Sequence, residues 1–529
     1  MNPVRLRDPA SGQMRLWAFL LLVFAFMVAA LCVLRYNGLW IEQDSSGMTA
    51  LIENMRQQGT LFPTSGRIYD NGFAYQAIAS CILGVTGLSA QQLQATIWPL
   101  LAMPILVLAA LAFFAQSARG RGTMALAGLL LLLQGDLLFV TLRGSHEKIG
   151  WPLMMVALAL LIRGASVSPG RLMLHVLAFY LIVFTMIANN VFFASTFIVA
   201  VLLSLALGVL LRALLHHNLS QAGDLRRLVY VVFSCMLLLF IFAFYLYPPA
   251  LRTVRALTGV AEQVSATMLG FSPTENPYQY VGLGWINNTV YLGLTLFTWL
   301  LIVGSFVEWL SWAREVLRGD RTVGIRENLV WLLYAGFAIQ VAIGVLVDFS
   351  GVLAQNLQLR IFPGYTVMAV VLLAHGVRRV LAASRDRRAL RPGLIAVSAM
   401  LFGWFSIAAL LKATNEPLLS NKWVFYSLSE AEALDWADGH LQSAYVWTGL
   451  DERIYEAGNF RRGGPSSSGN TYRGYALAGY ERYILFSERE RIRGTRIGRA
   501  MPAVAAWNRA YDSGDVYLYY RRPQTPYQR

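Results

Sequence analysis

The chain has 529 residues, of which 56% are hydrophobic and 14% charged, and its mean hydropathy is +0.50. This composition excludes a soluble globular protein, in which charged residues reach about 25%, and a disordered chain, which is poor in apolar residues. The net charge of +15 is spread over short segments between apolar runs rather than along a basic, aromatic-rich groove. We therefore expect an integral membrane protein with no nucleic-acid partner.

Apolar runs near the roughly 20 residues of a membrane-spanning helix recur along the first 411 residues. The first run follows Arg5, Arg7 and Arg15 and is longer than the apolar core of a signal peptide, so we interpret it as an uncleaved anchor. The runs predict a mainly α, polytopic protein with about eleven transmembrane helices. These lie near residues 16–34, 97–115, 123–141, 151–163, 172–188, 191–211, 228–247, 287–309, 328–347, 362–377 and 393–411.

Basic residues are unevenly divided between the two ends of these spans. The segments on the side of the N-terminus carry 20 arginines, and the opposite loops carry eight basic residues. Because short cytoplasmic loops hold the excess of Lys and Arg, we expect a cytoplasmic N-terminus and an extracytoplasmic C-terminus in a bacterial inner or plasma membrane. Residues 35–96, 248–286 and 412–529 are then extracytoplasmic.

The first outer loop, residues 35–96, combines acids with an amphipathic segment. Glu42 and Asp44 precede apolar residues at helical spacing from Met48 to Met55, which predicts a helix lying on the membrane surface. Asp44 has two interpretations, a chemical role or an N-cap of this helix. Tyr69 and Asp70 follow in an aromatic turn that is also typical of an interfacial belt.

The second outer loop gathers ionisable groups between the third and fourth spans. Arg143, His146, Glu147 and Lys148 fall within six positions, which fits either a solvated turn or a site where cations hold a phosphate and a carboxylate acts as base or metal ligand. Asp136 lies deeper, in the third span, where a carboxylate faces a polar cavity or bonds a neighbouring helix.

The remaining outer segments, residues 248–286 and 412–529, indicate a cap or lid and a small domain. Residues 248–286 combine an amphipathic helix with an irregular aromatic stretch that includes Tyr278, as a lid or a structural cap would. Residues 412–529 predict an extracytoplasmic α/β domain, in which Ser429 to Glu432 form a capping box at a helix start. The predicted domains are therefore residues 1–411, in the membrane, and 412–529.

Several short motifs together resemble the GT-C superfamily of membrane glycosyltransferases over residues 16–411. Acids follow the first span, a second acidic motif ends the third, and a late Arg-x-x-Pro begins at Arg360. The acids at 42 and 44 are separated by Gln43, unlike the adjacent Asp-Glu pair of protein mannosyltransferase-like members, and the tail lacks the Trp-Trp-Asp-type motif of oligosaccharyltransferases. The motifs are Glu42-Gln43-Asp44, Tyr75-Gln76-Ala77 with Leu83 to Ser89, Ala118 to Gly122, Ser145-His146-Glu147 and Gln358 to Pro363.

The resemblance implies an enzyme that moves a sugar from a polyprenyl-phosphate-linked donor to an extracytoplasmic glycan, lipid or protein. Asp44 would be the base for the acceptor hydroxyl, because a polyprenyl phosphate is already a competent leaving group. A divalent cation is left open as a cofactor. The expected site residues are Asp44, Glu147, His146 and Glu42 for catalysis, Arg360, Arg143 and Lys148 for the donor phosphate, and Tyr69, Asp70, Asp136 and Tyr278 in the substrate cavity.

Two other classes of function compete with this interpretation. A lipid or small-molecule transporter is expected to show internal repeats and broken spans with charges at the midplane, whereas the ionisable groups here cluster at the outer rim. The other competing class is a non-enzymatic scaffold for envelope assembly. A groove that joins Asp44, Glu147 and Arg360 would favour the enzyme.

Overall fold

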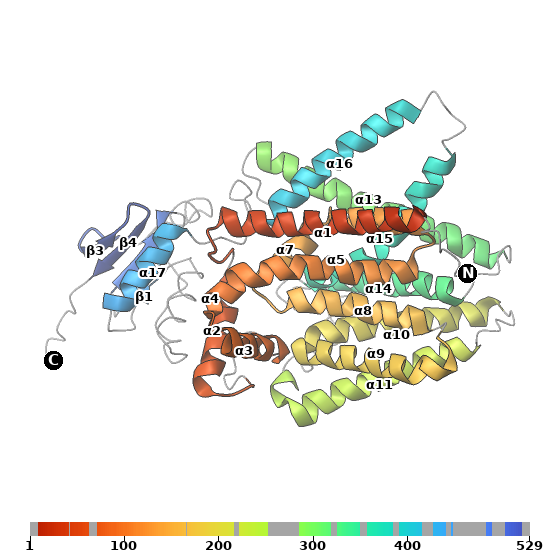
Figure 1. The fold of residues 1–529 in the computed structure, drawn as a ribbon, viewed down its shortest axis with the longest axis horizontal. Coiled ribbons are helices and arrows are strands. Elements are labelled where there is room, and N and C mark those ends of the chain that lie inside the picture. The colour runs from red at the N-terminus through yellow and green to blue at the C-terminus, as the bar shows by residue number, and fades with distance from the viewer. Residues whose placement is uncertain are drawn as a thin grey trace, which may run out of the picture.

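A computed structural model covers the chain and forms a bundle of long helices with a small sheet domain beyond one end of it (Figure 1). The predicted site residues Glu42, Tyr69, Asp70 and Tyr278 fall outside the described residues, as does most of the segment 248–286. The structure describes residues 9–41, 43–62, 71–164, 167–215, 222–251, 285–318, 325–349, 357–383, 391–414, 427–440, 446–447, 483–488 and 503–520.

Nine helices in the described part of the chain are long and apolar enough to cross a membrane, or ten if one bent pair counts as a span. The protein is therefore an integral membrane protein. The helices of the bundle are α1 (Pro9–Arg35), α4 (Ala90–Gln92) with the π-turn η1 (Leu93–Ile97) and α5 (Trp98–Ser117), α6 (Arg121–Leu131), α7 (Gly135–Leu142), α8 (Glu147–Gly164), α9 (Pro169–Asn189), α10 (Val191–Leu215), α11 (Ala222–Ile241) with η2 (Phe242–Leu246) and the short η3 (Pro248–Ala250), α13 (Trp285–Leu317), α14 (Ile325–Phe349), α15 (Leu357–Ala383) and α16 (Arg391–Ala413).

The predicted number of about eleven spans is not confirmed, because the described helices give nine or ten. The difference lies at the fourth predicted span, which is α8. This helix carries Glu147, Lys148 and Arg163 at its ends, and these charges set it apart from the long apolar helices. It packs against α5 and α9 and runs alongside them through the bundle (Figure 1).

The third predicted span, residues 123–141, is not one straight helix. It is divided into α6 and α7, which are bent by 69° at residues 132–134. Gln134 leaves the helical region, with φ −86° and ψ 85°, and Asp136 in the next turn pairs with Lys412 of α16, with 3.3 Å between Nζ and Oδ1. The polar residues thus turn the chain toward α16 where a continuous apolar helix was expected.

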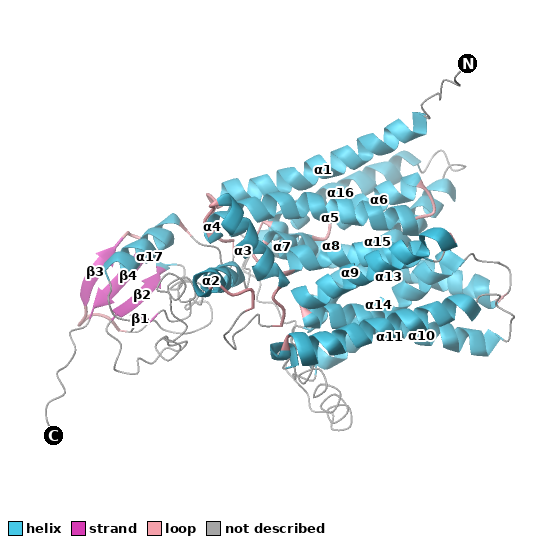
Figure 2. Ribbon diagram, turned by 60° about the horizontal axis from the view of Figure 1, so that its bottom comes forward, coloured by secondary structure: helices cyan, strands magenta, loops and turns pink. Residues whose placement is uncertain are grey.

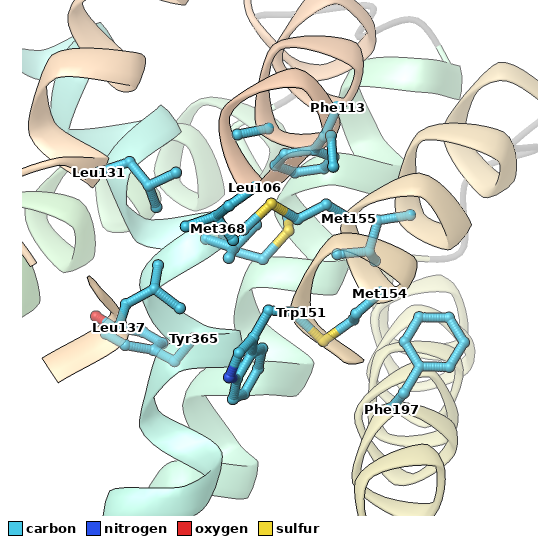
Figure 3. Close-up of a cluster of buried hydrophobic side chains, with 14 of the residues drawn as sticks. Leu106, Phe113, Leu131, Leu137, Trp151, Met154, Met155, Phe197, Tyr365 and Met368 are labelled. Atoms are coloured by element: carbon cyan, nitrogen blue, oxygen red, sulfur yellow. The ribbon is translucent and has the colours of Figure 1, made fainter. Parts of the chain in front are cut away.

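The core of the bundle is a continuous apolar cluster in which side chains from several helices interdigitate. Leu106 and Phe113 of α5 meet Met154 and Met155 of α8 and Met368 of α15 in this cluster (Figure 3). Such packing fixes the helix ends because a close-packed interior tolerates little displacement. The loops at the outer end are therefore held on a rigid base.

The amphipathic helix expected in the first outer loop is α2 (Gln43–Gln58), and α3 (Ala74–Thr86) follows it. Its apolar face packs on α3 and η1 rather than on lipid: Met48 and Ile52 are buried against Tyr75 and Leu93. The prediction of a helix with this apolar face is confirmed. Protein covers that face, and the location of the helix at the membrane surface stays a prediction. Glu53 and Arg56 form an ion pair on the exposed face.

The C-terminal region contains α17 (Leu428–His440) and a four-stranded sheet of β1 (Val446–Trp447), β2 (Tyr483–Ser487), β3 (Asn508–Asp512) and β4 (Val516–Tyr520). The strand order is β1-β2-β4-β3, with β1 and β2 parallel and the other pairs antiparallel. In the central pair, Leu485 lies opposite Leu518. The small α/β region expected from the sequence is thus present.

The capping box of α17 is two residues earlier than predicted. Ser427 donates its backbone N–H to Glu430 at 2.9 Å, and the Glu430 N–H is donated to the Ser427 hydroxyl at 3.2 Å. Ser429 contacts Asp515 instead. Two overlapping Ser-x-x-Glu patterns, from Ser427 and from Ser429, occur here, and the chain uses the first.

The two ends of the described chain lie at opposite ends of the bundle. Helix α1 begins at one end, and α2, α3, α4 and the sheet domain lie at or beyond the other, as both views show (Figures 1 and 2). The loops that carry the predicted acids are therefore on the side of the sheet domain.

Candidate functional site

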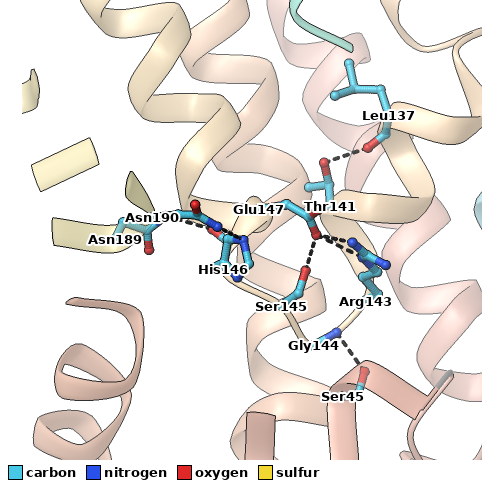
Figure 4. Close-up of polar contacts among 10 residues, drawn as sticks. All are labelled: Ser45, Leu137, Thr141, Arg143, Gly144, Ser145, His146, Glu147, Asn189 and Asn190. Carbon is cyan, nitrogen blue, oxygen red and sulfur yellow. Dashed lines mark hydrogen bonds and ion pairs between the residues drawn. The ribbon is translucent and has the colours of Figure 1, made fainter. Parts of the chain in front are cut away.

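Three segments far apart in the sequence meet at the end of the bundle that faces the sheet domain. They are the start of α2, residues 143–147 between α7 and α8, and the turn between α9 and α10, which residues 71–73 also contact. Figure 4 shows the polar contacts among them. We refer to this group as the outer cluster, defined by Ser45, Asn71, Arg143, Ser145, His146, Glu147, Asn189 and Asn190.

A hydrogen bond joins the two acidic motifs of the sequence. The Gly144 N–H is donated to the Ser45 hydroxyl at 2.7 Å, and both residues are buried. Ser45 follows Asp44 directly in the first turn of α2, and Gly144 is three residues before Glu147. The backbone at Asp44 is thereby tied to the loop that carries Glu147, although the Asp44 side chain is outside the described part of the structure.

The contact at Gly144 leaves no room for a side chain. A Cβ there would lie 2.6 Å from the Ser45 hydroxyl oxygen and 2.8 Å from its Cα. We expect Gly144→Ala to push α2 away from the loop and to destabilise the protein by about 1–3 kcal/mol, the usual effect of overpacking. A lowered melting temperature in detergent would show it.

Gly403→Ala is the matched control, because nothing lies within 4 Å of a Cβ at that position of α16. Alanine there is expected to leave stability unchanged or to raise it slightly, as it does in a helix interior. A Gly144→Ala protein that melts like this control would contradict the close contact.

Glu147 is the centre of a dense set of donors. The Arg143 guanidinium donates Nε at 2.9 Å, and its Nη2 and the Ser145 hydroxyl also contact the carboxylate. Among the described residues, every hydrogen bond to Glu147 goes to Oε2. The direction of this carboxylate is therefore fixed by its neighbours, and Oε1 accepts none of these bonds.

Glu147 is held in the ionised form. Burial raises the pKa of this carboxyl, but the charges of Arg143 and His146 and the hydrogen bonds from Arg143 and Ser145 outweigh burial and lower it to about 2. A carboxylate with so low a pKa is a weak proton acceptor near neutral pH, since efficient bases have a pKa near the working pH. Glu147 is thus better suited to orient a substrate or cation than to remove a proton.

His146 is bonded to the turn between α9 and α10. Asn190 accepts at Oδ1 from the Asn71 amide at 3.2 Å and from the Phe193 N–H at 3.1 Å, so its own amide N–H faces His146 Nε2. The network therefore makes Nε2 the His146 atom that contacts the Asn190 amide. The His146 carbonyl also accepts from the Asn189 amide, at 3.1 Å.

Residues 71–73, in the second half of the predicted aromatic turn, also contact this cluster. The Phe73 N–H is donated to the Ala188 carbonyl and the Val191 N–H to the Asn71 carbonyl, each at 2.8 Å. Between them, a Cβ on Gly72 would lie 2.3 Å from the Asn189 carbonyl oxygen. Only glycine allows this approach, which brings the first outer loop against the α9–α10 turn.

Arg360 lies at the outer end of α15, next to the α10 start. Its guanidinium is 6.0 Å from the ring centre of Phe192, and the side chain is exposed. Asp348 fixes this helix end, because its two carboxylate oxygens accept from the Leu357 N–H at 2.6 Å and the Gln358 N–H at 2.8 Å. Phe192 is two residues from Asn190, so Arg360 borders the outer cluster.

Two other predicted site residues have different surroundings. Lys148 is buried, with only 1% exposed. Asp136 is half exposed and pairs with Lys412 in the last turn of α16, on the side of the sheet domain. Lys412 is also 5.6 Å from the ring centre of Phe139. Glu42, Tyr69, Asp70 and Tyr278 lie outside the described residues. Within the described chain, no group of three or more His, Cys, Asp and Glu residues could hold a metal ion.

Two members of the outer cluster were not predicted as site residues. Ser45 and Asn71 have no distinctive local pattern, and their partners Gly144 and Asn190 are far along the chain. Asn189-Asn190 gave a signal: two adjacent amides between apolar runs mark a break in a helix. That boundary is where α9 ends and α10 begins.

Comparisons with known proteins find structural similarity and no sequence match. No family model matches the chain, and no curated protein matches it. The structure is similar to ArnT from Cupriavidus metallidurans in the apo state, with 13% identity over 97% of this chain and 98% of that chain and a TM-score of 0.46. ArnT from the same organism bound to undecaprenyl phosphate gives 12% identity over 96% and 98%, with a TM-score of 0.35.

Proposed function

We propose that this protein is a membrane glycosyltransferase that uses a polyprenyl-phosphate-linked sugar and an extracytoplasmic acceptor. The observation that carries the proposal is the hydrogen bond between Ser45 and Gly144, which brings the Asp44 backbone to the loop of Glu147, with Arg360 at the border of the same cluster. Acids and a cation meeting at the rim of a helical membrane bundle suit a lipid-phosphate donor held at the membrane surface.

The proposed step exchanges one bond at the sugar for another. The acceptor oxygen attacks C1 of the sugar, the bond between C1 and the phosphate oxygen breaks, and polyprenyl phosphate leaves with the electron pair. Asp44 takes the acceptor proton as general base. Glu147, ionised and oriented by Arg143, presents Oε1 to the sugar or to a cation, and Arg360 holds the phosphate.

The test is an assay of the purified full-length protein in lipid nanodiscs with a panel of radiolabelled polyprenyl-phosphate sugars and a membrane extract as the acceptor source. We expect release of polyprenyl phosphate and a labelled product with at least one donor. Folded protein that releases no polyprenyl phosphate from any donor of a broad panel would overturn the proposal.

A lipid or small-molecule transporter is a second candidate, and one observation favours it. The α6–α7 pair is a broken span with an Asp136–Lys412 ion pair at its bend, and broken helices with charges are typical of transporters. Flux of labelled lipid or sugar across liposomes that requires Asp136, without release of polyprenyl phosphate, would select this candidate.

The orientation in the membrane is part of the proposal. The arginine distribution places the N-terminus in the cytoplasm, and the sheet domain lies beyond the opposite end of the bundle. A reporter enzyme that works only outside the cytoplasm, fused after Arg529, is expected to be active in a bacterial host. Activity of a cytoplasm-only reporter at the same point, with the first silent, would reverse the orientation.

Arg360 is expected to bind the donor phosphate. Arg360→Ala should weaken donor binding by about tenfold or more, since charge-assisted hydrogen bonds contribute about 1.5–3 kcal/mol. Arg360→Lys should weaken it less, because lysine keeps the charge and loses the planar fork. Binding of a polyprenyl-phosphate sugar to protein in nanodiscs measures both, with the exposed Arg56→Ala as control. Equal, wild-type binding in both Arg360 variants would remove this residue from the site.

A further inference from the structure

We propose that Trp40 is a positioning residue through which the C-terminal domain holds the first turn of α2. This inference rests on the proposed function for its catalytic readout, because α2 begins with the residue assigned as base. The contacts that carry it run from strand β4 to Trp40, from Trp40 to Thr49, and from Thr49 to Ser45.

The first contact is apolar. Leu39 and Trp40, which lie between α1 and α2, are buried in one cluster with Val516 and Leu518 of β4 and with Ala433 of α17. Trp40 is 2% exposed. The C-terminal domain therefore covers the segment that immediately precedes Glu42-Gln43-Asp44, and its position sets the position of the Trp40 ring.

The second contact is polar and directional. The Trp40 indole has one N–H, and Nε1 donates it to the Thr49 hydroxyl at 3.1 Å. That hydroxyl in turn donates to the Ser45 carbonyl at 2.6 Å, a bond one helical turn back along α2. Both bonds are buried. Because Ser45 is also the residue that bonds Gly144, the indole is linked through one hydroxyl to the junction of the two acidic motifs.

A hydrogen bond also joins the ends of two membrane helices next to this segment. Tyr36, just after the end of α1, donates its hydroxyl to the Thr414 carbonyl at 2.7 Å, where α16 ends. Helix α16 therefore ends beside the segment that holds Trp40. A shift of the domain would move α2 by way of Trp40, and a catalytic geometry tolerates only about 0.5 Å of such movement.

The experiment removes the indole N–H and its acceptor separately and together. In Trp40→Phe and in Thr49→Val, hydrogen–deuterium exchange of peptides from residues 43–50 and around residue 144 is expected to become about two- to tenfold faster, the loss of one buried hydrogen bond. The double variant should be no faster than the more affected single variant, because both changes remove the same bond. Unchanged exchange in Trp40→Phe, or additive effects, would overturn the proposal.

The kinetic readout separates positioning from general stability. Both single variants are expected to lower kcat severalfold and to leave KM for the lipid donor unchanged, because the base is displaced and the phosphate site is intact. Trp17→Phe, an exposed position near the other end of α1, makes the same chemical change and should match wild type. Equal kinetic losses in Trp17→Phe would show a general effect and remove Trp40 as a positioning residue.

A third variant tests the domain itself. Leu518→Ala removes a fully buried side chain of β4 from the Trp40 cluster and should speed exchange in α2 as well as in the sheet. If the sheet loosens or unfolds while α2 exchanges as in wild type, the domain does not hold α2. The exchange measurements need no substrate, so a response in α2 without any sugar transfer would retain this inference and reject the proposed function.

Discussion

Replacement of Asp44 by asparagine is expected to lower sugar transfer by about two orders of magnitude or more while the protein folds as wild type. An amide cannot accept the acceptor proton, and general base catalysis contributes typically 10²–10⁴-fold. Asp44 is the second residue of α2, one position inside the helix rather than at the predicted N-cap, where a carboxylate contributes only about 0.3–1 kcal/mol through the helix dipole. A purely structural role of Asp44 at the helix start therefore predicts almost no change in transfer.

The measurement is the rate of polyprenyl-phosphate release together with the melting temperature of each variant. Glu53→Gln is the matched control, because Glu53 is on the exposed face of the same helix and pairs only with Arg56 across a surface ion pair among the described residues. Such pairs contribute little. An Asp44→Asn protein with near wild-type transfer would give Asp44 a purely structural role and remove the proposed base.

Much of the membrane fold could be predicted from the sequence because its signal is local. A helix in a bilayer needs a long apolar run, so each run marks a helix whatever its neighbours are. The bend between α6 and α7 could not be predicted in the same way. It depends on Asp136 meeting Lys412, a partner from a distant helix, and a polar residue in a span does not reveal which helix it will face.

The candidate site shows the same division between local and distant information. Asp44 and Glu147 were selected because each follows a span at the outer end, and the structure brings their loops together through Ser45 and Gly144. The role of Asn190 could not be predicted from the sequence, because its side-chain amide contacts Asn71 on one side and His146 on the other. Hydrogen bonds between loops that are far apart in the sequence can be identified only in the tertiary structure.

The C-terminal domain was predicted as a type of fold and not as a partner of α2. Strand composition and a capping pattern are local signals, and they indicated β2, β4 and α17. Its contact with Trp40 joins residues that are hundreds of positions apart in the chain. Trp40 itself carries no local signal of this role, since tryptophan is common at membrane surfaces.

The second large effect is expected at Glu147. Glu147→Gln leaves the Arg143 guanidinium, which is 10% exposed, without its countercharge. Removal of one partner of a buried ion pair destabilises a protein by about 3–5 kcal/mol, so we expect a clear fall in melting temperature together with loss of sugar transfer. An unchanged melting temperature and rate would instead make Glu147 part of a solvated turn.

The pH dependence of the melting-temperature difference between wild type and Glu147→Gln follows from the lowered pKa of Glu147. A carboxyl whose pKa falls from its unfolded value to about 2 in the folded protein contributes stability that is complete above the unfolded pKa of about 4.3. That contribution is lost as the pH falls from there toward 2. The melting-temperature difference between wild type and Glu147→Gln should therefore be constant from about pH 6 to pH 8, and a difference that grows across this range would contradict the ionised state.

The double variant Arg143→Gln with Glu147→Gln separates stability from chemistry. With both charges removed, neither member of this pair is left as an uncompensated ion, and much of the lost stability should return. Sugar transfer should not return, because Oε1 of a carboxylate is what the site presents to its ligand. The exposed pair Glu53→Gln with Arg56→Gln is the control for the loss of an ion pair as such and is expected to change stability by less than about 1 kcal/mol. Transfer restored along with stability in the Arg143 and Glu147 double variant would show that Glu147 only balances Arg143, and the proposed role of its carboxylate would be wrong.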